Sequence, residues 1–213
     1  RYQFGSVWRG ESPQVGRYRE FMQADIDIIG SSSVNADAEV IATIYATLKN
    51  LGIDDFQIQI NSRELLNKLL SCANVPVKKI TNVFQILDKR DKLGGQGIKN
   101  LLITEVGQNV ADNIQNALTN IPKEAEEETE EILTFLKNLQ TIIGFDFQNN
   151  QINEKLQLNF YLTRGLNYYT GMMFETFLTQ APKMGSIASG GRYDEMLLPF
   201  TGQKIPAVGA SMG

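Results

Sequence analysis

The 213-residue sequence contains no histidine and a single cysteine, Cys72. Without histidine, the chain cannot form a Ser-His-Asp triad, use an imidazole as general acid or base, or bind a metal through imidazole nitrogen. One thiol cannot form an internal disulfide or a Cys₄ zinc site. We therefore expect no metal ion bound by the protein's own side chains.

Long apolar runs are also absent. The longest mostly apolar stretch, residues 40–48, is too short and too polar to cross a bilayer. No basic segment followed by an apolar one marks a signal peptide, so we expect a cytoplasmic protein with no membrane partner. The chain begins at Arg1 without a methionine and stops at Gly213 within a glycine-rich strand pattern, and we expect a fragment of a longer polypeptide.

The composition is that of a soluble globular protein, with 42% hydrophobic and 21% charged residues. The length suits one large domain, or one core that carries an inserted module. A net charge of −4 argues against broad electrostatic coating of a nucleic acid but leaves room for a local basic site.

Residues 1–60 begin with two strand-like segments, 2–8 and 21–29. The short connection between them contains no helix, so the two strands must pair antiparallel. A 3.6-residue apolar period then predicts a helix that is capped by Asn35 and ends at Leu51, and alternation at 56–60 predicts another strand.

Residues 61–150 are helical in pattern, with segments near 62–72, 76–90, 96–105, 108–119 and 123–143. Six of the nine residues 123–131 are glutamates, which a solvated helix face near a positive N-terminus explains. Strand patterns return at 156–162 and 172–179, within residues 151–213. We predict an α+β fold, in which a mixed, mainly antiparallel sheet is flanked by helices and interrupted by a helical insertion over 61–150.

The strand at 21–29 has one polar face. Phe21, Gln23, Asp25 and Asp27 alternate with apolar residues, and the preceding loop holds three arginines within eleven residues. Guanidinium groups suit phosphate binding, so this hairpin is a candidate ligand surface. An ordinary half-exposed hairpin with a mobile loop explains the same pattern.

Two later segments also combine glycine with polar side chains. Residues 164–171 (RGLNYYTG) place two tyrosines after an arginine, and residues 189–194 (SGGRYD) place paired glycines within a strand pattern. Paired glycines mark a bulge or the close approach of a ligand or another backbone. The alternative is one core tyrosine and one surface tyrosine in the first segment, and a simple turn in the second.

Four segments, taken in order, resemble the catalytic core of class II histidyl-tRNA synthetases. They are residues 4–30 (FGSVWRGESPQVGRYREFMQADIDIIG), 164–175 (RGLNYYTGMMFE), 189–194 (SGGRYD) and 206–213 (PAVGASMG). The resemblance implies a class II synthetase-like sheet, a homodimer, and ATP, histidine and tRNA(His) as substrates. It also implies a reaction in two steps, formation of histidyl-adenylate and transfer of the histidyl group to tRNA.

For ATP, the resemblance implies that Arg9 grips the α-phosphate, Glu11 reads the adenine amino group, Arg17 faces the phosphates and Phe21 stacks on adenine. The nucleotide itself would carry Mg²⁺. Arg164 matches an arginine that stabilises the α-phosphate in the transition state, so Arg9 and Arg164 are the expected catalytic residues, and both also border the histidine.

For histidine, the resemblance places Gln23 at the backbone groups of the amino acid, and Asp27 and Tyr169 at the imidazole, with Tyr168 beside them. We expect Gln23 and Asp27, on one strand face and about 7 Å apart, to contact the two ends of one amino acid. The remaining expected pocket residues form its floor: Gly190 and Gly191, which leave room for the substrate, and Tyr193, which packs behind it.

A second function fits the same fold. A catalytically silent relative can serve as a histidine-sensing regulatory subunit of ATP phosphoribosyltransferase, and fold alone does not separate the two. The retained Arg9, Glu11 and Arg164 favour the ligase, because a sensor does not need to grip an α-phosphate. Asn167 stands where the family usually has aspartate. Motif 1, the acidic strand segment that completes the amino-acid pocket, the motif 3 arginine and an anticodon-binding domain lie outside this segment. We therefore expect the segment alone to be inactive.

Overall fold

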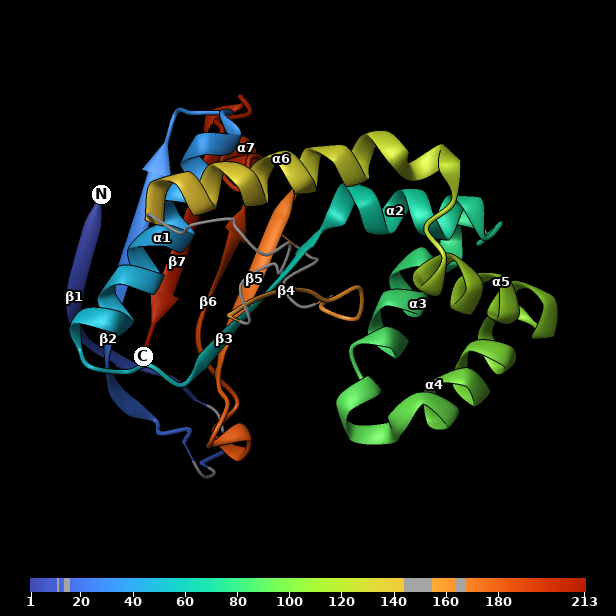
Figure 1. Ribbon diagram of the computed structural model, residues 1–213, viewed down its shortest axis with the longest axis horizontal. Helices are drawn as coiled ribbons and strands as arrows, with labels where there is room; N and C mark the ends of the chain where they lie inside the picture. Colours follow the sequence, from blue (N-terminus) through green and yellow to red (C-terminus); the bar gives the residue numbers. More distant parts are fainter. Residues whose placement is uncertain (11, 14–15, 144–154, 164–167) are drawn as a thin grey trace.

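The computed structural model describes residues 1–213 except 11, 14–15, 144–154 and 164–167, and its centre is a seven-stranded sheet (Figure 1). The strand order is β1-β2-β7-β6-β5-β3-β4. Of these pairs, β3–β4 is parallel and the others are antiparallel. The strands are β1 Tyr2–Trp8, β2 Glu20–Ile29, β3 Phe56–Ser62, β4 Leu156–Leu158, β5 Met172–Leu178, β6 Ser186–Arg192 and β7 Ala207–Met212. The predicted mixed, mainly antiparallel α+β fold is confirmed.

The helices account for most of the segment between β3 and β4. The α-helices are α1 Val34–Asn50, α2 Arg63–Cys72, α3 Ile80–Leu87, α4 Arg90–Val106, α5 Gln108–Thr119, α6 Glu126–Ile143 and α7 Leu198–Thr201. Three short 3₁₀ turns are η1 Val77–Lys79, η2 Lys123–Ala125 and η3 Pro182–Met184. Within α4, Gly94 has φ 67° and ψ 173°, so two helices meet there at a kink that few other residues could adopt.

Helix α1 begins two residues earlier than expected. The predicted cap Asn35 is wrong, because the side chain of Ser33 accepts a hydrogen bond from the Asn35 backbone N–H at 3.2 Å and serves as the N-cap. The helix also ends at Asn50, with Leu51 as its C-cap. Most of the expected apolar face is confirmed, since Val40, Ile41, Ile44, Tyr45 and Leu48 are buried. Leu51, the last residue expected on that face, is 64% exposed.

One hydrophobic core joins the sheet to the helices. It runs from Phe56, Ile58 and Ile60 of β3 through α1, α2 and α6 to Val83 and Ile114 of α3 and α5. Figure 1 shows α6 running past α1 and α2, whereas α3, α4 and α5 gather beyond the β4 side of the sheet. The apolar residues of β2 face this core, so its polar residues face away from it. Across the residues that the structure describes, no helix combines the length and apolarity needed to cross a membrane.

A buried arginine joins the end of β6 to the start of α1. The Arg192 guanidinium donates to the Asp37 carboxylate at 3.0 Å, to the Ser31 and Ser33 carbonyls at 3.0 and 3.3 Å, and to Asp194 at 3.2 Å. Arg192 is 9% exposed and Asp37 is 4% exposed. The planar guanidinium satisfies several acceptors at once, so it fixes the chain on both sides of this contact.

We expect Asp37→Asn to destabilise the fold by about 3–5 kcal/mol, because the charge of Arg192 would remain buried without its partner. Urea unfolding measures this change. The matched control is Lys204→Ala, which removes the exposed ion pair with Glu195 and should leave the unfolding midpoint unchanged. Equal midpoints for both variants would contradict a structural role for the buried pair.

Candidate functional site

A cavity of about 310 Å³ lies on the face of the sheet that points away from α1. Strand residues supply its floor, and the segments after Arg164 and after β6 supply its tyrosine walls. The lining includes Asp25, Asp27, Tyr168, Tyr169, Ser189, Tyr193, Gly209 and Ser211. The cavity is large enough for a small polar metabolite.

Strand register brings these residues together. Asp27 pairs with Gly209, which pairs with Gly191, and these three positions form one row across β2, β7 and β6. A parallel row, two residues along, joins Asp25, Ser211 and Ser189. Because side chains alternate along each strand, both rows face the same side of the sheet. Residues up to 186 positions apart in the sequence, such as Asp25 and Ser211, thus share one surface.

Asp27 and Tyr193 form the hydrogen-bonded pair at one end of the cavity. The Tyr193 hydroxyl donates to Oδ1 of Asp27. Burial, the hydrogen bond to Asp27 and the negative charge of that carboxylate all raise the pKa of the Tyr193 hydroxyl above its ordinary value. Tyr193 therefore stays neutral at physiological pH and acts as a donor. Tyr193 was expected to pack behind the substrate, and in the structure its hydroxyl contacts the Asp27 carboxylate.

Tyr168 and Tyr169 also line the cavity. Their ring centroids are 4.3 Å apart. Burial and a hydrogen bond with Tyr168 raise the pKa of the Tyr169 hydroxyl, which keeps it protonated. Arg63 donates to the Tyr169 carbonyl at 2.7 Å, and the Thr170 N–H donates to the Arg192 carbonyl at 2.7 Å. These bonds hold the tyrosine segment against the sheet.

Glycines on the two inner strands make space for specific side chains. A Cβ on Gly209 would lie 2.1 Å from Oδ1 of Asp27, and a Cβ on Gly191 would lie 2.8 Å from the Tyr169 ring. Gly209 thus accommodates the Asp27 carboxylate, and Gly191 accommodates Tyr169. The prediction that Gly190 leaves room for a substrate is wrong in direction, because its Cβ would point into the core, 2.7 Å from the Phe174 ring.

Asp25 connects Gln23 to β7. Its Oδ1 accepts hydrogen bonds from Nε2 of Gln23 at 2.7 Å and from Oγ of Ser211 at 2.6 Å. Gln23 lies on the expected strand face. Asp27 lies four positions further along β2, so the expected separation of about 7 Å is wrong: the rise of a strand gives about 13 Å, and Asp25 lies midway between the two residues.

The hairpin end holds the predicted nucleotide residues that the structure describes. The Arg9 guanidinium lies 3.8 Å from the centroid of the Phe21 ring. Arg17 is exposed at the base of the connecting loop. Phe21 is six residues from Asp27, about 20 Å along β2, so the hairpin and the tyrosine-lined cavity occupy opposite ends of one strand. Glu11, Arg164 and Asn167 lie outside the described residues.

Several lining residues carried no role in the sequence prediction, namely Asp25, Ser189, Gly209 and Ser211. The sequence analysis placed Asp25 on the polar strand face but gave it no function. Ser189, Gly209 and Ser211 belong to segments that resemble the family, but no role was predicted for these three residues. Their role depends on pairing between distant strands, which no local pattern in the sequence reports.

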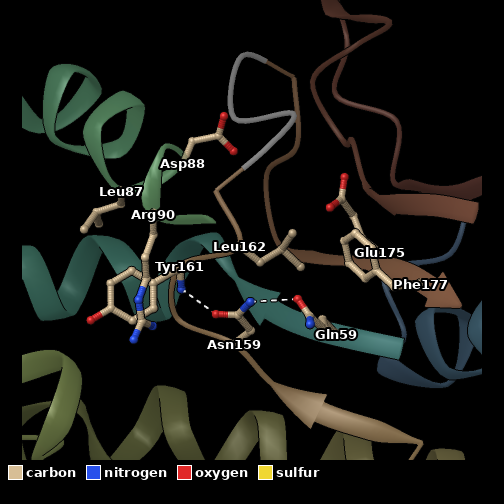
Figure 2. Close-up of a pocket in the computed structure, with 9 residues that line it drawn as sticks. All are labelled: Gln59, Leu87, Asp88, Arg90, Asn159, Tyr161, Leu162, Glu175 and Phe177. Atoms are coloured by element: carbon tan, nitrogen blue, oxygen red, sulfur yellow. Dashed lines mark hydrogen bonds between the residues drawn. The ribbon is translucent and has the colours of Figure 1, made fainter. Parts of the chain in front are cut away.

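A second, smaller cavity of about 20 Å³ lies where the sheet meets the helical segment (Figure 2). Asn159 donates to Oε1 of Gln59 at 2.7 Å and accepts from the Tyr161 backbone N–H at 2.9 Å. The Arg90 guanidinium stacks 3.6 Å from the centroid of the Tyr161 ring. Such a space holds about one water molecule. The cavity is a small packing gap where α3 and α4 meet the sheet, and it is too small for a substrate.

Comparison with known proteins gives a consistent result. A family model described as Histidyl-tRNA synthetase matches residues 2–213. A histidine–tRNA ligase of Helicobacter hepaticus is 37% identical over 228 residues, which cover 100% of this chain and 51% of that protein. A histidine–tRNA ligase of Treponema denticola is 37% identical over 224 residues, which cover 100% of this chain and 50% of that protein. The chain spans about half the length of the curated relatives it matches.

Solved structures agree on the fold. The crystal structure of histidyl-tRNA synthetase from Nostoc sp. PCC 7120 matches with a TM-score of 0.81 and 29% identity, covering 100% of this chain and 52% of that one. A structure from Bacillus halodurans C, titled ATP phosphoribosyltransferase regulatory subunit/histidyl-tRNA synthetase, matches with a TM-score of 0.79 and 22% identity, covering 98% and 55%. At that identity, the second match supports the fold alone.

We expect Gly209→Ala to destabilise the fold by about 1–3 kcal/mol, because the added methyl group must displace the Asp27 carboxylate. The control is Gly5→Ala on β1, where a Cβ would have no heavy atom within 4 Å. Thermal unfolding of both variants measures the difference. If Gly209→Ala were as stable as Gly5→Ala, the tight packing between β2 and β7 would be disproved.

Proposed function

The chain belongs to the histidyl-tRNA synthetase family, and on that basis we propose that the protein carrying it is a histidine–tRNA ligase. The proposed reaction activates histidine with ATP to histidyl-adenylate and then transfers the histidyl group to tRNA(His). The observation that carries the proposal is the cavity in which Asp27, Tyr193 and Tyr169 converge. The division into core residues 1–60 and 151–213 and a helical insertion over 61–150 is part of the same proposal.

The tyrosine-lined end of the cavity suits an imidazole ring. Asp27 supplies an acceptor for a ring N–H, and Tyr169 supplies a hydroxyl that its raised pKa keeps protonated. The three tyrosine rings that line the cavity match a flat ring. A site that hydrogen-bonds such a ring discriminates against analogues lacking its nitrogens by roughly 10⁴-fold, because its own polar groups would stay unpaired.

The hairpin end suits the nucleotide. Phe21 offers a flat apolar ring, and Arg9 supplies a fixed positive charge beside it. In the proposed first step, the histidine carboxylate attacks the α-phosphorus of ATP and pyrophosphate leaves with the electrons of the broken P–O bond. Positioning and positive charge accelerate this step, so the chain needs no nucleophile or histidine base of its own. Arg9 and Arg164 are the proposed sources of that charge, with Glu11 and Arg17 as further ATP contacts.

We assign Mg²⁺ to the nucleotide. The described part of the chain contains no group of three acidic, cysteine or histidine side chains placed to hold a metal ion. Phosphate oxygens are the ligands that Mg²⁺ prefers.

We also propose a cytoplasmic homodimer. The edge strand β1 exposes Tyr2, Phe4 and Trp8 on one face, at 85%, 71% and 71% exposure. A row of exposed aromatic residues at the edge of a sheet is typical of a surface that another chain covers.

No observation specifically favours the alternative function, a regulatory subunit of ATP phosphoribosyltransferase. The curated relatives at 36–37% identity are named histidine–tRNA ligases, and the match that carries a regulatory title supports the fold alone. The Arg9 guanidinium beside the Phe21 ring also suits a bound nucleotide, which a histidine sensor does not need to bind.

The intact gene product should catalyse ATP–pyrophosphate exchange with histidine and with none of the other nineteen amino acids. The assay measures adenylate formation without tRNA. Histidine binding without exchange would overturn the ligase proposal and favour the sensor.

Asp27→Asn should raise KM for histidine about 10- to 100-fold in this assay, with a smaller change in kcat, because a hydrogen bond to a charged acceptor is lost. Glu39→Gln on the exposed side of α1 is the matched control and should behave as wild type. An unchanged KM for Asp27→Asn would disprove the imidazole contact.

A further inference from the structure

The loop between β1 and β2 carries Arg17, a proposed contact of ATP. The Arg9 N–H donates to the Arg19 carbonyl at 2.8 Å, and this bond closes the base of the loop. Residues 16–19 are exposed, so core packing does not fix the part of the loop that holds Arg17. Adenylate formation depends on the exact position of the positive charges around the phosphates. The place of this loop therefore has to be set by a contact outside the core.

The connection between β5 and β6 supplies such a contact. It contains the 3₁₀ turn η3, and Figure 1 shows this turn beside the β1–β2 loop at one end of the sheet. A Cβ on Gly16 would lie 3.1 Å from both the Cα and the carbonyl oxygen of Met184, and 3.2 Å from its Cβ. Two of these three atoms belong to the backbone, which cannot swing aside as the end of a flexible side chain does. The loop thus meets the turn backbone to backbone.

Gly16 permits this contact in two ways. Its φ is +73°, in the left-handed region that residues with a side chain rarely adopt, and its missing Cβ leaves space for Met184. Gly52, in the turn between α1 and β3, has a similar φ of +75°, but a Cβ there would have no heavy atom within 4 Å. Comparison of these two glycines separates the conformational requirement from the contact.

The same end of the sheet also supports Phe21, the ring proposed to stack on adenine. A Cβ on Gly213 would lie 3.0 Å from the Phe21 ring, so the backbone that follows β7 lies against that ring. The Gly213 N–H donates to the Ile187 carbonyl at 3.1 Å, and Ile187 is three residues after Met184 at the start of β6. The start of β6 and the turn before it therefore support the hairpin at two places.

We propose that Gly16 is a positioning residue, whose contact with the Met184 backbone docks the β1–β2 loop on η3 and sets the place of Arg17 at the nucleotide. This inference rests on the proposed function. Along the chain, Arg17 lies between the two supported residues, Gly16 and Phe21. A guanidinium held in this way loses less conformational entropy when it binds phosphate.

Pyrophosphate exchange by the intact gene product tests the proposal. Gly16→Ala should raise KM for ATP about 10- to 100-fold, as expected for a displaced charged contact, and KM for histidine less than about 2-fold. Gly52→Ala carries a similar backbone strain without the contact and should change neither KM. Gly16→Asn adds the same Cβ, but asparagine tolerates a positive φ, so it should raise KM for ATP as much as Gly16→Ala does.

Tryptic cleavage provides a readout that does not depend on activity. Trypsin cuts after Arg17 and after Arg19, and both bonds are more accessible in an undocked loop. Gly16→Ala and Gly16→Asn should therefore be cut at these bonds several times faster than wild type, and Gly52→Ala at the wild-type rate. Mass spectrometry of the fragments measures the cleavage.

Three results would overturn the proposal: wild-type behaviour of Gly16→Asn, which leaves backbone strain as the cause; equal rises of KM for ATP and for histidine; or unchanged cleavage with an unchanged KM for ATP. Faster cleavage of the Gly16 variants in a protein whose wild type exchanges no pyrophosphate would sustain the docking contact and overturn only the ligase.

Discussion

The register between β2, β7 and β6 is the constraint on which the site depends. Ile26, Ala210, Gly190 and Phe174 form one row across β2, β7, β6 and β5 and face the core. The neighbouring rows carry the polar residues to the opposite face. A slip of one residue between β2 and β7 would exchange the two sets and bury Asp25 and Asp27. Core packing therefore sets the position of the polar site as well as the stability of the sheet.

The glycines are part of this constraint. The space that a side chain would take at Gly209 and at Gly191 is occupied by Asp27 and by Tyr169, respectively. At Gly190 the corresponding space is occupied by the Phe174 ring. Side chains from neighbouring segments thus contact these glycines on both faces of the sheet. The buried Arg192 then joins the end of β6 to the start of α1, which orients the adjacent Tyr193 towards Asp27.

Local sequence patterns predicted the elements well, because alternation and the 3.6-residue period are local properties. The antiparallel hairpin, the strand at 56–60 and most helical segments were predicted in this way. The cap of α1 was misplaced because Ser33 and Asn35 are both good capping residues, and the choice depends on which side chain meets a free backbone N–H. The direction of Gly190 was missed for a related reason, since paired glycines do not show which of them faces the core.

The parts of the site that sequence could not predict are those that need two distant strands. Asp25 was visible on the polar face, but its contact with Ser211 joins residues 186 positions apart. Gln23 and Asp27 were expected to serve one amino acid directly, whereas the rise of the strand places Asp25 between them. The resemblance supplied residue roles along single segments, and the fold supplied the distances between those segments.

The parallel pairing of β3 and β4 joins Ile58 to Leu156 across the whole helical segment. Contacts this far apart in the sequence are slow to form, because the loop between them must first lose entropy. The helices between the two strands are built from local contacts, which form faster. We therefore expect the helices between Arg63 and Ile143 to form first and to shorten the effective loop before β4 pairs with β3.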